Sequence, residues 1–254
     1  MQPKIIGKRY ILQDMLGQGG MGTVYRAEDR LTGQTVALKQ VIATAEVIDL
    51  STSYNVEDFR LGLAREFKLL ASLRHPHIIE VIDYGFDDEQ QPYFTMELLE
   101  NAQTVLDASR DLSVEQRVTL IVQMLQALDY LHRREILHRD LKPANVLVVD
   151  NQIKMLDFGL SVMRDHVAQD EAEDTTAGTL TYMAPEILMG HSATERSDLY
   201  AVGMMAYELL AGFHPFKDMD AATLINSILY TIPDIEKIDV KIEVAQVVGK
   251  LLHK

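Results

Sequence analysis

The chain has 254 residues, of which 38 are acidic and 24 are basic, so its formal charge is −14. It has no cysteine, which excludes disulfide bonds, thiolate nucleophiles and cysteine-ligated metal centres. The acidic balance argues against a nucleic-acid partner, because nucleic-acid-binding proteins usually carry a basic footprint. No apolar run approaches the roughly 20 residues that cross a bilayer, and residues 1–10 are too polar for a signal peptide. We therefore expect a soluble cytoplasmic protein without a membrane segment in this chain.

The first hundred residues carry short β-branched and aromatic runs that are separated by turns, a pattern that predicts strands. Five runs qualify, over residues 10–16, 23–28, 35–42, 78–86 and 93–98. Between the third and the fourth, Phe59, Leu63, Phe67 and Leu70 recur at spacings of three and four. This spacing predicts one helix, over residues 56–73.

After residue 99 the pattern becomes helical. Ser113 and Gln116 fit the capping box that opens a helix, and an apolar stripe continues to Leu131. Further helices are expected over residues 197–211, ending at Gly212, and over 221–230 and 242–252. The sequence thus predicts an α+β protein, with a small five-stranded antiparallel sheet lobe over residues 1–98 and a larger, mainly helical lobe over residues 99–254.

Three glycines, Gly17, Gly19 and Gly22, form a G-x-G-x-x-G pattern. A strand follows it where a dinucleotide-binding turn would open a helix, and Thr23 stands where the loop of P-loop NTPases needs lysine. What remains is a glycine-rich hairpin tip whose backbone N–H groups can approach phosphates. A merely flexible turn is the alternative.

Lys39 ends the apolar run Val36-Ala37-Leu38. A lysine that points inward needs an anionic partner, because an unpaired buried ammonium is costly. Glu66, on the predicted helix, is a candidate for that partner. An outward, solvated Lys39 is the alternative.

Three later motifs give these residues a common meaning. The chain reads H-R-D-L-K-P-A-N over residues 138–145, D-F-G over 157–159 and A-P-E over 184–186. In this order, and with the glycine loop and the strand lysine, they resemble the eukaryotic-type (Hanks-type) serine/threonine protein kinase catalytic domain, in particular its bacterial members. The resemblance runs from about residue 10 to the end of the chain and implies the bilobal protein-kinase fold.

The resemblance implies transfer of the ATP γ-phosphate to serine and threonine hydroxyls of protein substrates. Asp140 would accept the proton of the incoming hydroxyl, and Lys142 would place a cation on the transferred phosphate. Lys39 would hold the α- and β-phosphates, and Glu66 would hold Lys39.

The resemblance also implies residues that bind the metal, residues that contact adenine, and a residue that supports the catalytic loop, residues 138–145. Asn145 and Asp157 offer the oxygen ligands that suit Mg²⁺ or Mn²⁺, and Asp198 would brace the backbone of the catalytic loop. Met96 stands at the gatekeeper position, and residues 97–99 form the hinge. The implied ATP contacts are Leu16, Gly17, Gly19, Gly22, Val24, Ala37, Lys39, Met96, Glu97, Leu99 and Leu147. Simple core packing is the alternative for the apolar ones.

Regulation is implied by Arg139, which precedes the catalytic aspartate as in kinases controlled by phosphorylation. Thr175 or Thr176 is the candidate phosphosite, modified by another copy of the chain. Two solvated loop threonines are the alternative.

Two features depart from the family pattern. Residues 43–54 lengthen the segment between Lys39 and Glu66. In addition, no arginine follows Arg196, although a late arginine holds Glu186 in the family, so we expect an unpaired Glu186 and a fragment of a longer protein. Two rival functions stay open: a nucleotide-binding scaffold without transfer activity, and a small-molecule kinase of related fold.

Overall fold

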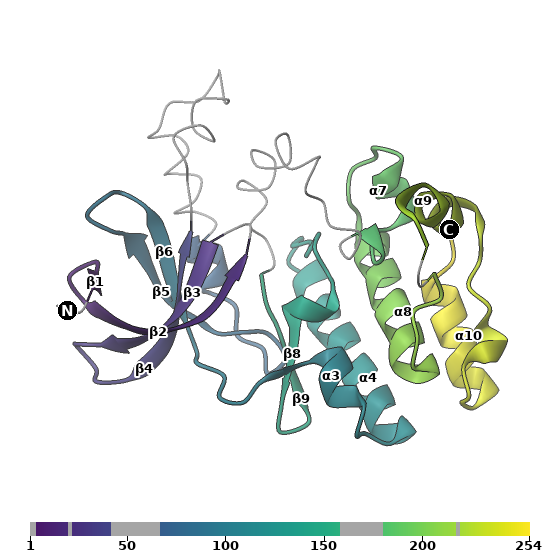
Figure 1. Cartoon of the computed structure of the whole chain (residues 1–254), viewed down its shortest axis with the longest axis horizontal. Coiled ribbons are helices and arrows are strands. Elements are labelled where there is room, and N and C mark those ends of the chain that lie inside the picture. Colours follow the sequence, from purple (N-terminus) through teal and green to yellow (C-terminus); the bar gives the residue numbers. More distant parts are fainter. Residues whose placement is uncertain (1–3, 20–21, 42–66, 158–179, 217–218) are drawn as a thin grey trace. The chain divides into compact units, whose positions relative to one another are not determined.

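A computed structural model describes residues 4–19, 22–41, 67–157, 180–216 and 219–254 (Figure 1). These residues form two compact units. The first comprises the described residues up to Arg74 together with Ile79–Glu100. The second comprises His75–Ile78 and the described residues from Asn101 onward.

The first unit is built on an antiparallel sheet of six strands within the described residues. In spatial order they are β1 (Ile5–Ile6), β2 (Tyr10–Gly19), β3 (Gly22–Asp29), β4 (Thr35–Val41), β6 (Pro92–Met96) and β5 (Val81–Phe86). The five predicted strands are therefore confirmed, with ends that shift by up to three residues. The predicted number is wrong by one, because β1 is too short to produce a recognisable alternation. It pairs back onto β2 through a turn in which Gly7 and Lys8 have φ angles of 56° and 58°.

The helix predicted over residues 56–73 lies mostly outside the described residues. At its described end, Phe67 and Leu70 are buried while Leu69 is exposed, as one apolar face requires. The Phe67 ring packs against Tyr84 and Phe94, with centroid distances of 5.6 and 5.4 Å. This end of the segment thus covers strands β5 and β6.

The two faces of the sheet have different uses. Residues that oppose each other across neighbouring strands share a face. One face carries a buried core, made up of Ile6, Tyr10, Ala27, Val36, Leu38 and Tyr93. The register pairs Val24 with Lys39, and Ala37 with Met96, so these side chains gather on the opposite face.

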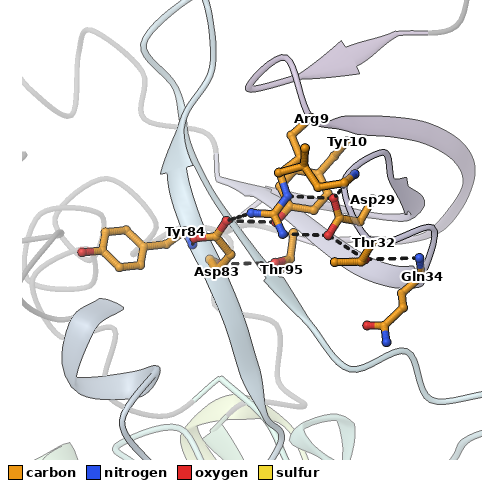
Figure 2. A network of polar contacts seen from close by, with 9 residues as sticks. Arg9, Tyr10, Asp29, Thr32, Gln34, Asp83, Tyr84 and Thr95 are labelled. Atoms are coloured by element: carbon orange, nitrogen blue, oxygen red, sulfur yellow. Dashed lines mark hydrogen bonds and ion pairs between the residues drawn. The ribbon is translucent and has the colours of Figure 1, made fainter.

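A polar network closes the edge of this core (Figure 2). Arg9 donates from Nε and Nη2 to the two oxygens of Asp29, at 2.7 Å each, and from Nη1 to Asp83 Oδ2 at 2.6 Å. The Tyr10 hydroxyl also donates to Asp83 Oδ2, at 3.0 Å. Asp29 is only 3% exposed, and the hydrogen bond from Arg9 holds its pKa well below the usual range. One guanidinium thereby joins the end of β3 to strand β5.

Replacing Arg9 by alanine should destabilise the first unit by about 3 kcal/mol, because it leaves the buried Asp29 carboxylate without its cation. Urea unfolding of Arg9→Ala measures this loss. Arg30→Ala, which removes an exposed arginine near the same turn, is the matched control and should change the stability by less than about 0.5 kcal/mol. Equal effects of the two variants would show that the network contributes nothing specific.

The second unit is mainly helical. Its helices are α3 (Val105–Ser109), α4 (Val114–His132), α7 (Pro185–Leu188), α8 (Glu195–Ala211), α9 (Ala221–Tyr230) and α10 (Ile242–Leu251), with short 3₁₀ turns η1 (Pro143–Asn145) and η3 (Ile235–Lys237). A small sheet joins β7 (Gln103–Thr104), β8 (Val146–Val149) and β9 (Gln152–Met155).

The predicted helix signals are confirmed. Ser113 and Gln116 form a complete capping box at the start of α4, and α8 ends at Gly212 with a φ of 81°. Helix α8 is buried along most of its length, and Gly203 allows α10 to approach closely, because a β-carbon there would lie 2.8 Å from the Leu251 side chain. None of the helices in the described parts of the chain is long and apolar enough to cross a membrane.

Candidate functional site

The carboxylate of Asp198, in the first turn of α8, holds the backbone at the start of the H-R-D motif. Its two oxygens accept the backbone N–H groups of His138 and Arg139, each at 2.9 Å, and His132 Nε2 lies 2.9 Å from Oδ2. Asp198 is 2% exposed. Arg139 has a φ of 68°, a conformation that costs energy for a non-glycine residue and needs outside support. The predicted brace of the catalytic-loop backbone is therefore confirmed.

Asp140, Lys142 and Asn145 come together directly after this braced backbone. Lys142 Nζ lies 3.1 Å from Asp140 Oδ2. Asn145 Nδ2 donates to the same oxygen at 3.0 Å and to the Asp140 carbonyl at 2.8 Å. The amide therefore fixes both the backbone and the side chain of Asp140. The Asp140 carboxylate keeps 11% of its side-chain surface exposed, so it is oriented without being sealed off.

Asp157 belongs to the same neighbourhood. The N–H of Leu156 donates to the Asn145 carbonyl at 2.8 Å, which places Asp157 next to the turn η1. Asp157 adopts a φ of 55°, another strained backbone position. One amide and one carboxylate are thus supplied from two segments that a backbone hydrogen bond joins.

Lys39 lies in the first unit and is 6% exposed, so the alternative of an outward, solvated lysine is wrong. Its Cα partners are Val24 on β3 and Phe94 on β6. Its ammonium lies 6.0 Å from the centroid of the Phe94 ring. Glu66, the predicted partner, lies outside the described residues, so the pair stays a prediction.

The described glycines of the pattern lie on the predicted hairpin of β2 and β3, on either side of residues 20–21, which are outside the described residues. Gly17 pairs with Val24, and Gly19 pairs with Gly22. Gly22 has a φ of 134°, and a β-carbon there would collide with the Gln40 carbonyl oxygen. Only glycine is therefore compatible with this backbone.

The sheet register fixes where the residues of the first unit that are implied to contact adenine lie, while the contact with adenine itself stays a prediction. Ala37 and Met96 are neighbours across β4 and β6 and are 5% and 8% exposed. The Glu97 N–H donates to the Glu80 carbonyl, and Glu97 Oε1 accepts the Glu80 N–H, both at 3.0 Å, which pins the start of the hinge.

The remaining implied contacts are less fixed by the structure. Leu16 is 46% exposed at an irregularity of β2. Leu99 follows the pinned part of the hinge. Leu147 belongs to β8 in the second unit. Their contact with adenine stays a prediction.

A buried cluster that the sequence did not reveal supports the segment before A-P-E. The Tyr182 hydroxyl donates to Glu208 Oε2 at 2.5 Å. His214 Nε2 lies 3.2 Å from the Thr181 carbonyl, and its ring meets Tyr182 edge-on at 5.4 Å. Burial, and then the bond to Glu208, raise the pKa of Tyr182, so its hydroxyl stays a neutral donor. The only available signal was a charged residue, Glu208, inside the apolar run of α8.

Glu186 corrects an expectation. We expected it to lack a partner, because no arginine follows Arg196. Its Oε1 instead accepts the Ser197 hydroxyl at 2.6 Å. A neutral hydroxyl at the start of α8 thus satisfies the acceptor that an arginine was expected to hold.

The candidate phosphosites, Thr175 and Thr176, lie outside the described residues. So do the lengthening residues 43–54 and the rest of the D-F-G motif after Asp157.

Comparisons with known proteins identify the family. Residues 10–252 match the protein kinase domain, so the chain belongs to the protein kinase family. It is 38% identical over 222 residues to a probable serine/threonine-protein kinase of Streptomyces coelicolor, covering 85% of this chain and 32% of that protein.

Two further relatives widen the comparison. The chain is 36% identical to the Aurora kinase of Schizosaccharomyces pombe, over 89% of this chain and 59% of the relative. It is also 36% identical to the DNA damage-responsive serine/threonine-protein kinase RqkA of Deinococcus radiodurans, over 91% of this chain and 34% of the relative. The chain thus spans about a third of the length of the Streptomyces and Deinococcus relatives. Membership of the family implies the use of ATP.

The buried histidine makes the stability of the second unit depend on pH. Burial lowers the pKa of His214 from its usual value of about 6.5. At a pH just below 6.5, the His214 ring therefore stays neutral in the folded chain but is protonated in the unfolded chain. The stability should therefore be lost as the pH falls below about 6.5, by at most about 1.4 kcal/mol per pH unit for this group.

The measurement is urea unfolding between pH 5 and pH 8. His214→Gln should reduce the slope, whereas His191→Gln, at an exposed position, should leave it unchanged. An unchanged slope in His214→Gln would contradict the assignment.

Proposed function

We propose that this chain is the catalytic domain of a protein kinase that transfers the γ-phosphoryl group of ATP to serine and threonine hydroxyls of protein substrates. The observation that carries the proposal is the Asp140–Lys142–Asn145 arrangement behind the Asp198 brace. The family and the named activities of the relatives support it.

Each residue has a distinct task in this reaction. Asp140 accepts a hydrogen bond from the incoming hydroxyl and takes its proton as the new P–O bond forms and the bond to the leaving diphosphate breaks. Lys142 stabilises the charge of the group in transfer, and it already lies against Asp140. Lys39 neutralises the α- and β-phosphates from within the first unit. Its burial strengthens that attraction, because solvent screens it less.

Asn145 and Asp157 fit a magnesium ion, with Mn²⁺ as a substitute. Mg²⁺ prefers oxygen ligands, keeps several waters and binds through one or two carboxylates plus substrate phosphates. An amide oxygen and a carboxylate leave most positions to those ligands. When bound, the metal neutralises phosphate charge.

The adenine ring would lie on the sheet face that Val24, Ala37 and Met96 share, with hinge contacts at Glu97 and Leu99. The glycine hairpin would cover the phosphates with backbone N–H groups. Since the side chains opposite this face form the core of the first unit, ATP would bind to a preformed surface.

Asp140→Asn tests the transfer step. It keeps the size of the side chain but removes the base, so phosphorylation of a generic protein substrate should fall by about a hundredfold or more. The dissociation constant for ATP should change little. The assay is transfer of label from γ-labelled ATP, with Asp111→Asn, at an exposed position, as the control.

The outcomes also separate the rival functions. ATP binding by the unmodified chain without any transfer would support a scaffold and contradict the proposal. Transfer to small metabolites but not to proteins would support a small-molecule kinase. Transfer at an undiminished rate by Asp140→Asn would remove Asp140 from the mechanism.

We propose further that phosphorylation of Thr175 or Thr176 by another copy of the chain activates the enzyme. Arg139 supports this proposal, because the Asp198 brace fixes its backbone beside the catalytic aspartate and a guanidinium binds a phosphate strongly. Thr175→Ala combined with Thr176→Ala should lower the activity of the autophosphorylated enzyme by about tenfold. A single Thr→Ala exchange at an exposed position, Thr223→Ala, serves as the control. Active protein without phosphate at either threonine, measured by mass spectrometry, would contradict this.

A further inference from the structure

A groove in the second unit is lined by none of the residues that we assign to phosphoryl transfer. It has a volume of about 900 Å³ and lies between the loop His75-Pro76-His77 and helix α4. The α4 residues that line it include Val122, Gln126 and Tyr130, at successive spacings of four, so they form one stripe along the helix. Val122 is 46% exposed and leaves part of the groove floor apolar.

A cluster of aromatic rings holds a guanidinium in this groove. The Arg134 guanidinium lies 3.7 Å from the centroid of the Tyr130 ring. The Tyr130 ring in turn lies 4.9 Å from the His75 ring, and His75 lies 5.4 Å from His77. A stacked arginine is pre-organised, so less side-chain entropy is lost when its remaining N–H groups bind an anion.

Within the described parts of the chain, the Arg134 guanidinium donates one hydrogen bond. Its Nη1 donates to the Tyr130 carbonyl at 3.2 Å, a bond that also satisfies the end of α4. This is one of the five N–H groups that a guanidinium offers. The hydrogen bond to the end of α4 therefore leaves most of the Arg134 N–H groups available to another acceptor.

One of the two histidines, His75, adds a donor. His75 Nδ1 accepts the His77 N–H at 3.2 Å, so the proton of the neutral His75 ring is on Nε2, which is a donor. Burial lowers the pKa of both rings, and the positive charge of Lys154 lowers both further.

The charge of the groove is opposite to that of the chain. Two arginines, Arg133 and Arg134, and one aspartate, Asp129, line the groove, and Asp129 is paired with Arg133 at 2.9 Å. The positive charge of Lys154 also acts on the groove, because it lowers the pKa of the histidines. The whole chain carries −14. A cationic and partly apolar groove on an acidic protein complements a ligand that carries both carboxylates and an apolar side chain.

We propose that this groove binds an acidic peptide segment of a partner protein, with a carboxylate on Arg134 and an apolar side chain against Val122. The binding requires neither ATP nor phosphoryl transfer. It would give the kinase a docking contact separate from the residues that carry the chemistry.

The test is fluorescence polarisation with a labelled peptide, Glu-Glu-Leu-Glu-Glu, without ATP. The peptide should bind more tightly than its neutral counterpart, Gln-Gln-Leu-Gln-Gln, and more weakly as the salt concentration rises. Arg134→Gln should weaken binding of the acidic peptide by about tenfold, since it removes a charge-assisted hydrogen bond. Val122→Glu, a change at an exposed position that removes no polar contact, should weaken it through repulsion.

Matched controls lie elsewhere on the same unit. Arg110→Gln exchanges an arginine with a 77% exposed side chain, and Val247→Glu exchanges a valine that is 48% exposed; neither residue lines the groove. Both should leave the affinity unchanged. Equal affinities for the two peptides would overturn the proposal. So would losses as large in the control variants as in Arg134→Gln and Val122→Glu. Because the assay contains no ATP, such a failure would leave the proposed kinase activity untouched.

Discussion

The arrangement of the catalytic loop depends on one buried carboxylate. Asp198 accepts two consecutive backbone N–H groups and the ring of His132, although they are separated from it by about sixty residues of chain. An unpaired carboxylate in this position would be costly, and three donors remove that cost. These hydrogen bonds fix the backbone at Arg139, the residue before Asp140. Arg139 has a φ of 68°, a left-handed conformation that is costly for a residue other than glycine. The placement of Asp140, Lys142 and Asn145 follows from this constraint.

A similar division of labour organises the first unit. The alternation of side chains along β3 and β4 sends Ala27, Val36 and Leu38 into the core and gathers Val24, Ala37 and Lys39 on the other face. The residues that would meet ATP are therefore positioned by the same register that buries the core. A slip of one residue would exchange the two sets, so the core fixes the register of the candidate site.

Local sequence signals predicted many of the helix ends and turns of this fold. The capping box at Ser113, the end of α8 at Gly212 and the hairpin at Gly17–Gly22 each depend on a few neighbouring residues, and the structure has all three. The candidate catalytic residues Asp140, Lys142 and Asn145 could be named in advance because they stand in a motif of fixed spacing, and the structure brings their side chains together. Strand β1 was missed because two residues carry no period.

The contacts that escaped prediction join distant segments. Tyr182 meets Glu208 and Glu186 meets Ser197 through side chains that no spacing rule connects. The Arg9 network joins residues that are 20 and 74 positions apart. The sequence showed which polar residues sit in apolar surroundings, but the partner of each depends on how the chain folds back in space.

The most direct test of Asp198 as a brace is the turnover number, kcat, of the Asp198→Asn variant. It is measured on folded protein with saturating ATP and compared with kcat of the unmodified chain. The backbone N–H groups of His138 and Arg139 use different oxygens of Asp198, and in asparagine one of these positions becomes an NH2 donor, so one of the two N–H groups loses its acceptor. The account predicts that kcat falls by about a hundredfold, because small displacements of catalytic groups are that costly, while the dissociation constant for ATP changes little. A variant that circular dichroism shows to be folded and that retains the full kcat would contradict the account.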